Sequence, residues 1–347
     1  MVYSSMLRLP SDLHDAVVQQ LAKVPAARWI REAQALSERY RAERRGGEDS
    51  LATGHLQVLG YAALILPATY AQLYGAMAAV AQRLPTWQPS SLLDIGSGPG
   101  TALWAAAQHW PSLKHMSAWE REAAFITLGR ELAQQSDSAA IRAARWERVD
   151  VTNIAHVVHQ TYDLVIIGHV LNELDLETRQ ALLSLAWRMT SGLLLIVEPG
   201  SEAGFAVVRS TRDQLLALGA HTIAPCVHDR ACPLENDWCH FPQRIVRPEF
   251  QRRARGAPSE WEESKFSYAA MARFEALQPA WGRTIFEAQS NKAYAEIKIS
   301  SQEGVSRYRA LKRNKPAFKL VRDLAWGELL EQKPDVELEA LDLPDEA

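Results

Sequence analysis

Two patterns of apolar residues divide the chain. From residue 11 to about residue 84, apolar side chains recur at steps of three and four residues, which predicts helices. After Pro89, short runs of mostly apolar residues alternate with amphipathic segments, and we expect strands at 91–95, 115–119, 145–149, 162–167 and 192–197. Apolar strands that alternate with helices are typical of a parallel sheet covered on both faces. The pattern therefore predicts an α/β fold with a doubly wound, mostly parallel sheet.

These patterns predict four regions of the chain. An N-terminal helical region, 1–87, precedes the α/β core, 88–222. The next segment, 223–330, is rich in cysteine and basic residues, and we expect a late strand near its end, at 293–300. The last region, 331–347, holds seven acids and one Lys, which predicts a solvated acidic tail.

The N-terminus gives no sign of export or membrane insertion. Residues 1–13 lack the apolar centre of a signal peptide and the Arg-rich composition of a transit peptide. The longest apolar stretch, 58–68, has 11 residues and is too short to cross a bilayer. Three cysteines without a secretory context indicate a reducing compartment. We therefore expect a soluble, cytoplasmic protein with no membrane partner.

The sharpest motif is a glycine loop, LDIGSGPG, between a predicted strand and a predicted helix. Its glycines are Gly96, Gly98 and Gly100, and Asp94 stands two positions ahead of the first. Glycines let the backbone turn tightly and let a ligand approach the peptide groups. The dinucleotide pattern G-x-G-x-x-G would need glycine where Thr101 stands, which disfavours NAD.

Two more acids follow the next two predicted strands. Glu120 ends the first, where an acid can accept hydrogen bonds from two ribose hydroxyls. Asp150 ends the second, from which a carboxylate can reach an adenine amino group. With Asp94 near the amino-acid part of the ligand and the glycines forming the floor, the set predicts binding of S-adenosylmethionine (SAM).

The loop after the fourth predicted strand holds the catalytic candidates. Its polar residues His169, Asn172 and Glu173 lie at the carboxyl edge of the sheet, where ligands bind. Methyl transfer needs little acid–base chemistry, because the sulfonium is already a good leaving group and alignment supplies most of the effect. A role in anchoring the loop fits these residues equally well, and the sequence assigns no methyl acceptor.

All three cysteines, Cys226, Cys232 and Cys239, fall within 14 residues. So tight a cluster indicates metal ligands. Zinc with one histidine is possible, but the short C-x2-4-C pair of zinc sites is missing, and the spacing C-x5-C-x6-C favours an iron–sulfur cluster. A cubane cluster normally takes four thiolates. The fourth ligand would be His228, His240, an oxygen ligand or a group from outside the chain.

Six segments in this order resemble one protein family: LPATYAQLYGAM, SLLDIGSGPGTALWAA, YDLVIIGHVLNEL, VEPG, PCVHDRACPLENDWCHF and ESKFSY. They are similar to the methyltransferase-like family of the mitochondrial small ribosomal subunit and its bacterial relatives, over roughly residues 10–327. The resemblance implies a class I SAM methyltransferase-like fold and a role in small-subunit assembly and translation. It also implies a 4Fe–4S cluster, for which Cys226, Cys232 and Cys239 match three ligands.

Two positions depart from the family. Ser300 stands where the family has its fourth cluster cysteine, and serine can ligate iron only through oxygen. Leu66 stands where the family usually has an arginine before Pro-Ala-Thr-Tyr. The resemblance thus implies a site with three thiolates, with Ser300, His228 or His240 as the fourth ligand.

Residues 241–320 are basic, with 16 Lys and Arg against 8 Asp and Glu, although the whole chain has a formal charge of -3. Aromatic residues such as Trp261 and Tyr308 lie between the cations, a mixture that suits phosphate contacts and stacking on unpaired bases. A solvated charged surface is the alternative, and the resemblance favours ribosomal RNA, with no DNA partner expected. The candidate RNA-binding residues are Arg244, Arg247, Arg252, Arg253, Arg255, Lys312, Arg313 and Lys315.

Together, the residues and the resemblance predict a SAM-dependent, methyltransferase-like protein that acts on the small ribosomal subunit or its RNA. It would carry an iron–sulfur cluster and be monomeric outside the ribosome. One alternative is a non-catalytic, RNA-binding ribosome assembly factor that keeps the methyltransferase fold. Another is a methyltransferase for a small molecule, for which the basic segment would be incidental.

Overall fold

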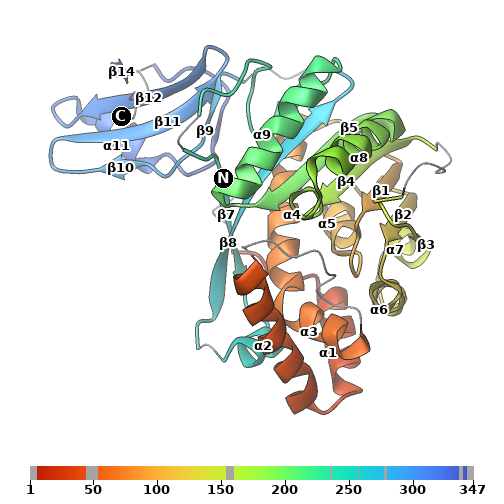
Figure 1. The fold of residues 1–347 in the computed structure, drawn as a ribbon. Helices are drawn as coiled ribbons and strands as arrows, with labels where there is room; N and C mark the ends of the chain where they lie inside the picture. Colours follow the sequence, from red (N-terminus) through yellow and green to blue (C-terminus); the bar gives the residue numbers. More distant parts are fainter. Residues whose placement is uncertain are drawn as a thin grey trace.

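The computed structural model describes residues 6–43, 54–153, 160–234, 237–256, 258–276, 280–335 and 339–341. Its centre is an eight-stranded sheet in the order β3-β2-β1-β4-β5-β8-β6, with β7 also paired to β8. The strands are β1 (Ser91–Ile95), β2 (His115–Glu120), β3 (Arg145–Arg148), β4 (Tyr162–Gly168), β5 (Thr190–Pro199), β6 (His221–Ala224), β7 (Phe241–Val246) and β8 (Trp261–Ala272). β1 to β5 run parallel and β8 runs antiparallel to its neighbours, which confirms the predicted α/β class with a mostly parallel sheet (Figure 1).

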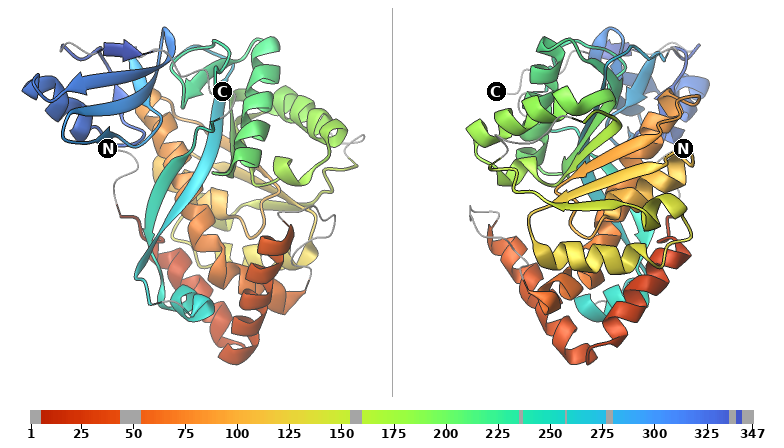
Figure 2. Two further views of the ribbon diagram at one scale, coloured as in Figure 1. Left: turned by 60° about the vertical axis from the view of Figure 1, so that its left-hand side comes forward. Right: turned by 90° about the vertical axis from the view of Figure 1, so that its right-hand side faces the viewer.

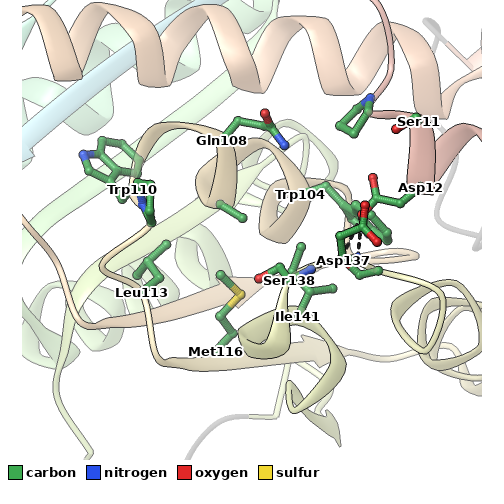
Figure 3. Close-up of a pocket in the computed structure, with 14 residues that line it drawn as sticks. Ser11, Asp12, Trp104, Gln108, Trp110, Leu113, Met116, Asp137, Ser138 and Ile141 are labelled. Carbon is green, nitrogen blue, oxygen red and sulfur yellow. Dashed lines mark hydrogen bonds between the residues drawn. The ribbon is translucent and has the colours of Figure 1, made fainter.

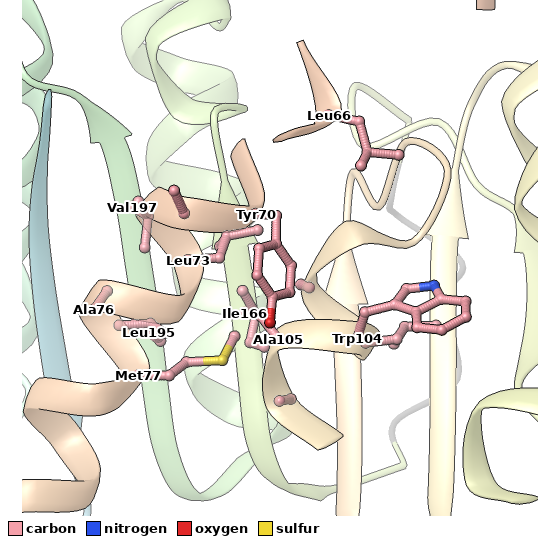
Figure 4. Close-up of a cluster of buried hydrophobic side chains, with 14 of the residues drawn as sticks. Leu66, Tyr70, Leu73, Ala76, Met77, Trp104, Ala105, Ile166, Leu195 and Val197 are labelled. Carbon is pink, nitrogen blue, oxygen red and sulfur yellow. The ribbon is translucent and has the colours of Figure 1, made fainter. Parts of the chain in front are cut away.

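Helices cover both faces of this main sheet. On β4, Leu164 and Ile166 belong to one apolar core, whereas Val165 and Ile167 belong to the other. Figure 4 shows side chains of α4 packed on those of β4 and β5 in the first core. The first face carries α4 (Leu66–Arg83), α5 (Thr101–His109) and α6 (Ala123–Ala133), and the second carries α8 (Leu176–Met189) and α9 (Glu202–Ala217). Two short helices, α7 (Ala139–Arg142) and η1 (Leu171–Glu173), lie in connections.

The main sheet includes strands from beyond residue 222, where the sequence pattern placed the end of the core. β8 lies between β5 and β6 and extends further to pair with β7. Its first half alternates exposed and buried residues, while its second half is wholly buried. Charged residues in that first half, Glu262, Glu263 and Lys265, interrupt the apolar run by which a buried strand is identified in sequence.

The N-terminal helices form a layer at one end of the molecule (Figures 1 and 2). They are α1 (Ser11–Ala22), α2 (Ala26–Glu43) and α3 (His55–Leu64), against which α10 (Glu249–Arg255) packs. α3 approaches α2 closely, since a Cβ added at Gly60 would lie 2.8 Å from the backbone nitrogen of Ala33. In the described part of the chain, no single helix is long and apolar enough to span a membrane. The pair α3 and α4 meets that length and composition but bends by 54° between the two helices.

A second, smaller sheet lies at the opposite end from the N-terminal helices (Figures 1 and 2). This C-terminal sheet has the order β13-β9-β11-β12-β14, with β10 paired to β11, and α11 (Lys315–Asp323) packs on it. Its strands are β9 (Gly282–Thr284), β10 (Gln289–Ser290), β11 (Tyr294–Ser301), β12 (Gly304–Leu311), β13 (Leu329–Leu330) and β14 (Glu339–Leu341). β14 comes from the predicted acidic tail, of which 336–338 and 342–347 lie outside the described residues.

Candidate functional site

The glycine loop joins β1 to α5 and is held by the neighbouring strand β2. The backbone nitrogen of Gly96 donates to the carbonyl of Trp119 at 2.8 Å, and that of Gly98 donates to Glu120 Oε2 at 2.8 Å. Gly96 has a φ of 71°, and a Cβ there would lie 2.3 Å from Val170 Cγ2, so this position requires glycine. Nothing lies within 4 Å of a Cβ added at Gly98, which leaves the loop open at that point.

Asp94 lies buried beneath this loop, with 3% of its surface exposed. Its Oδ2 has no hydrogen-bond partner among the described residues. Burial, together with the negative charge of Glu120, raises the pKa of Asp94 to about 8, so the carboxyl group is mostly protonated at pH 7. A buried carboxyl group with an unpaired oxygen favours a ligand that is a cation or a hydrogen-bond donor.

Glu120 and Asp150 occupy different environments. The two carboxylate oxygens of Glu120 accept hydrogen bonds from the backbone nitrogens of Gly98 and Glu122, each at 2.8 Å. Burial raises the pKa of Glu120, and these hydrogen bonds oppose the rise. Each oxygen keeps a lone pair that a ligand hydroxyl could use. Asp150 is exposed and accepts a hydrogen bond from the Thr152 amide, which lowers its pKa.

A small cavity of about 30 Å³ lies over the glycine loop. Among the predicted residues, the structure brings Asp94, Gly96, Gly98 and His169 together around it, and the other predicted ligand residues do not line it. The remaining lining residues are Tyr61, Thr69, Leu73, Ser97, Thr101, Ala102 and Gly168. The contribution of α3 and α4 to this site was not predicted, because the apolar period of these helices indicates core positions only.

Tyr61, on α3, links the N-terminal helices to the acids of the site. Burial raises the pKa of its hydroxyl to about 12, a hydrogen bond with Thr69 lowers it in part, and the charges of Glu173, Glu120 and Asp94 add to the rise. These charges act on Tyr61 because all three acids lie near it. The N-terminal helices therefore form one wall of the site.

His169 has an unusual backbone and an unpaired ring nitrogen. Its φ of 60° lies in the left-handed region, which few residues other than glycine adopt, and its backbone nitrogen donates to the carbonyl of Val197 at 2.8 Å. Its Nε2 is buried with no hydrogen-bond partner in the described chain. Burial lowers the pKa of His169 to about 4, so the ring is neutral at pH 7. The other two candidates, Asn172 and Glu173, are exposed on η1.

Glu198, at the end of β5, is a further buried acid at this edge of the sheet. Its Oε1 accepts a hydrogen bond from the backbone nitrogen of Leu171 at 2.9 Å, whereas Oε2 has no partner among the described residues. Burial raises the pKa of Glu198 to about 8. Glu198 therefore anchors η1 and, through it, the loop that carries His169. The segment VEPG marks this residue in the sequence, but its pattern does not distinguish an anchor from a ligand.

A larger cavity of about 420 Å³ lies away from the glycine loop, between the start of α1, the end of α5 and α7. Figure 3 shows Asp12, Trp104, Gln108 and Met116 around it. The carboxylate of Asp12 accepts hydrogen bonds from the hydroxyl of Ser136 at 3.1 Å and from the backbone of the next residue at 2.9 Å. Asp12 is thus already paired, and the other acid of this cavity, Asp137, is exposed, so neither is a buried acid without a partner like Asp94.

The three cysteines lie in the loop between β6 and β7. Cys226 and Cys232 are half-buried and Cys239 is buried. Burial raises the pKa of the Cys232 thiol, and it raises the pKa of the Cys239 thiol well above its ordinary value. The charge of Cys226 adds to both pKa shifts, because the three thiols lie near one another. The positive charge of Arg283 opposes the shift at Cys239. Arg283 is itself fully buried on β9 and donates through Nε to the carbonyl of Pro225 at 3.0 Å.

The predicted metal centre gains no support from the arrangement of its ligands. Among the described residues, no group of three or more His, Cys, Asp or Glu side chains is placed to hold a metal ion. His228 Nε2 lies 3.1 Å from Ser300 Oγ, so two of the three candidates for a fourth ligand contact each other. The third, His240, stacks on Trp238 and packs edge-on against Trp326.

The eight predicted RNA-binding residues lie in two separate places. Five arginines lie on β7, on α10 and in the connection between them, near the N-terminal helices. The other three candidates lie in the turn between β12 and α11 and at the first residue of α11, in the C-terminal sheet (Figures 1 and 2). Arg247 and Arg255 share Glu262 Oε2 at 3.3 and 3.1 Å, and Arg244 pairs with Glu263 at 3.2 Å. Three of the five arginines are therefore ion-paired with two acids of β8.

Comparisons with known proteins relate the chain to ribosome-associated proteins. A family model described as "Mitochondrial small ribosomal subunit Rsm22" matches residues 55–331. The human ribosome assembly protein METTL17, mitochondrial, is 27% identical over 305 residues, which cover 80% of this chain and 65% of that protein. The Rsm22-cox11 tandem protein 2 of Schizosaccharomyces pombe is 26% identical over 218 residues, 56% of this chain and 29% of that protein. The chain thus spans less than two thirds of the length of these curated relatives.

Solved structures with some likeness to this chain include SAM-dependent enzymes. Magnesium protoporphyrin IX methyltransferase of Synechocystis PCC 6803, solved with bound SAM, is 12% identical with a TM-score of 0.37, covering 70% of this chain and 97% of that one. The N-methyltransferase NodS of Bradyrhizobium japonicum WM9 is 12% identical with a TM-score of 0.36, covering 57% and 84%.

The comparisons also bear on the cellular location. The expectation of a cytoplasmic protein is wrong by this measure, because the human and fission yeast relatives are all described as mitochondrial. The assignment of the chain to a family rests on the length of the match to the family model, since residues 55–331 make up most of the chain. This chain belongs to the mitochondrial small ribosomal subunit Rsm22 family.

Proposed function

We propose that this chain is a SAM-binding, methyltransferase-like protein that acts on the small ribosomal subunit or its ribosomal RNA. Membership of the Rsm22 family supports the small-subunit role, and the human relative is described as a ribosome assembly protein. The observation that carries the SAM part is Asp94, a buried carboxyl group with an unpaired oxygen beneath a glycine loop that is open at Gly98.

The polar groups around the small cavity suit the parts of SAM. Three buried atoms there lack a hydrogen-bond partner among the described residues: Asp94 Oδ2, Thr101 Oγ1 and His169 Nε2. Asp94 would hold the ammonium group of the ligand, and Glu120 would use its remaining lone pairs for the ribose hydroxyls. When bound, SAM supplies a methyl group activated by its sulfonium. The neutral ring of His169 adds no positive charge near that cation.

The cavity has to widen to admit such a ligand. Its volume is about 30 Å³, whereas ligand pockets usually have roughly 300 Å³ or more. Tyr61 and Leu73, from α3 and α4, form one wall, and Val170 packs on Gly96 from the loop after β4. The proposal therefore includes a displacement of these side chains when the ligand enters.

Calorimetric titration with S-adenosylhomocysteine tests the SAM part of the proposal. The wild-type protein is expected to bind, and Asp94→Asn to bind at least tenfold more weakly, a loss of about 1.4 kcal/mol or more. Asp163→Asn is the matched control, because Asp163 lies at the start of β4, at the opposite edge of the sheet. If the wild-type protein does not bind the ligand at millimolar concentration, the SAM part is refuted.

The small size of the cavity also favours one alternative, a ribosome assembly factor that transfers no methyl group. Incubation of the protein with radiolabelled SAM and small-subunit particles separates the two. Label in RNA or protein of the particles supports the enzyme. Stable binding to the particles without label, in a preparation that binds S-adenosylhomocysteine, supports the alternative.

An iron–sulfur cluster belongs to the proposal, and the wide C-x5-C-x6-C spacing of the three cysteines favours it over zinc. The three cysteines share one loop, and His228 of that loop contacts Ser300, but the described side chains are not arranged to hold a metal ion. Iron and sulfide in equal amounts in anaerobically purified protein would support it, and more iron is expected in Ser300→Cys. Protein with zinc, or with no metal, would refute it.

A further inference from the structure

The C-terminal sheet carries cations that have no acidic partner. Residues 281–323 contain ten Lys and Arg and four Asp and Glu, a net charge of 10 - 4 = +6. Some of these cations are paired, since Glu296 lies 2.6 Å from Arg309 and Asp237 accepts a hydrogen bond from Lys298. Five exposed cations have no ion pair with any described residue: Lys292, Lys312, Arg313, Lys315 and Lys319. These five residues are here called the basic tip.

The basic tip is a single surface although it comes from three segments. Lys292 lies in the turn between β10 and β11, and the backbone nitrogen of Lys312 donates to the carbonyl of Ala293, next to that turn, at 2.8 Å. Lys315 begins α11, and Lys319 lies one turn further along the same face of that helix. All five side chains therefore gather at one end of the C-terminal sheet.

That end points away from the rest of the protein. At the other end of β11, Ser300 lies 3.1 Å from His228 of the cysteine loop, and Arg230 donates to the carbonyl of Glu303. β11 has eight residues, so the basic tip lies roughly 25 Å from this attachment. Figures 1 and 2 show the C-terminal sheet projecting to one side of the main sheet. The sheet thus presents its unpaired charge at a distance from the candidate SAM site.

We infer that the basic tip binds the phosphate backbone of RNA, an inference that rests on the proposed function at the small ribosomal subunit. Five unpaired cations on one surface match a polyanion and would release condensed counterions on binding. The tip offers phosphate contacts and little base stacking, because Phe318 is half-buried against the core of the C-terminal sheet, with Lys312 Nζ 5.9 Å from its ring centroid. The contact is therefore largely independent of base sequence.

The arginines of β7 and α10 serve a different purpose. Arg247 and Arg255 neutralise the buried Glu262, and Arg253 lies over the ring of Trp29 at 5.7 Å. Removing such an arginine would take one of two charged partners from a buried acid, so a loss of binding there would report in part on folding. The tip cations have no such partners and can be changed with little effect on stability.

Filter binding to protein-free, in vitro transcribed small-subunit ribosomal RNA tests the inference. The variant K312Q/R313Q/K315Q removes three tip cations, and R28Q/K114Q/R188Q removes three exposed, unpaired cations elsewhere. Each phosphate contact contributes about 0.7 to 0.9 to the slope of log affinity against log salt. Taking the affinities at 1 M salt as the reference, the tip variant should therefore bind about 100-fold more weakly than the wild type at about 0.1 M salt. Its plot of log affinity against log salt should be flatter by about two to three. The control should stay within twofold, and thermal melting checks that both variants fold.

Each other outcome overturns the inference in a recognisable way. Equal losses in the tip variant and the control would mean that only net charge matters. A tip variant that keeps its affinity for RNA but loses intact small subunits would identify an acidic protein as the partner. If the wild-type protein does not bind the RNA, the inference and the RNA part of the proposed function fail together, whereas the titration with S-adenosylhomocysteine would be unaffected.

Discussion

Replacing Asp94 by asparagine is expected to make the ligand-free protein more stable at pH 7. Asp94 has a pKa of about 8 in the folded protein against 3.8 as an ordinary side chain, because it is buried near Glu120. At pH 7 the unfolded chain has released this proton and the folded chain keeps it. Each pKa unit corresponds to about 1.4 kcal/mol, so the roughly three units between 3.8 and 7 lower the stability by up to about 4 kcal/mol.

Asparagine removes this cost because its amide stays neutral in both states. The gain is smaller if the second N–H of the amide finds no acceptor, which costs about 1–3 kcal/mol. We therefore expect Asp94→Asn to be about 1–4 kcal/mol more stable at pH 7. The gain should shrink as pH falls towards 4 and vanish well below the ordinary pKa of 3.8, where aspartate is protonated in both states. A raised pKa means that the stability of the wild-type protein falls as pH rises from about 4 to about 8 and levels off above that.

Urea denaturation of the wild type and the variant at several values between pH 4 and pH 9 measures this difference. Asp163→Asn provides a control of opposite sign. Burial favours a higher pKa for Asp163, but hydrogen bonds from Ser90 and Ser91 to its carboxylate lower it overall. That variant should therefore be less stable than the wild type at neutral pH, with the difference shrinking in acid. An Asp94→Asn protein destabilised equally at pH 4 and pH 8 would refute the assignment of a buried, protonated Asp94.

Three further changes have definite expected outcomes. Residues 332–347 carry six acids and one Lys and include β14, which pairs with the edge of β12. Deleting them should raise the affinity for RNA several-fold at low salt but not at high salt, as measured by filter binding. Gly60→Ala should lower the stability by about 1–3 kcal/mol in thermal or urea melts, because its Cβ would meet the backbone of Ala33. Glu198→Gln should keep an oxygen that accepts the hydrogen bond from the backbone nitrogen of Leu171. Because burial raises the pKa of Glu198 to about 8, the wild-type protein should lose stability between about pH 5 and pH 8, and the variant should not show this loss. A pH–stability curve for that variant parallel to the wild type would contradict this.

The sequence predicts the five parallel strands and the late strand at 293–300, which corresponds to β11, but misses strands such as β8. The five predicted runs correspond to β1–β5, with ends that differ by at most two residues. β8 is not predicted because charged residues alternate with apolar ones where it pairs with β7, although its second half is buried between β5 and β6. An antiparallel strand inserted from about 60 residues downstream depends on long-range pairing, which local periodicity does not encode.

The site shows the same division between local and long-range information. Asp94 is predictable because the glycine loop fixes its place at the end of a strand, whereas Tyr61 and Thr69 reach the site only through the packing of α3 and α4. Runs of charged residues in the sequence likewise do not show which charges form ion pairs in the fold. Arg247 and its acid Glu262 are 15 residues apart and meet only across the β7–β8 pair, so composition alone cannot distinguish paired cations from those of the basic tip.

The titratable groups at the carboxyl edge of the sheet explain how the site could favour a cation. Burial keeps Asp94 and Glu198 mostly protonated at pH 7 and keeps His169 uncharged, so all three are neutral without a ligand. The cation of the proposed ligand would stabilise the ionised form of Asp94, since an opposite charge nearby lowers the pKa of an acid. Binding at pH 7 would then release close to one proton, and the carboxylate would gain the partner that its Oδ2 now lacks. Because Asp94 becomes charged only when a cation enters, the free site avoids charge repulsion between Asp94 and Glu120 and still discriminates against anionic ligands.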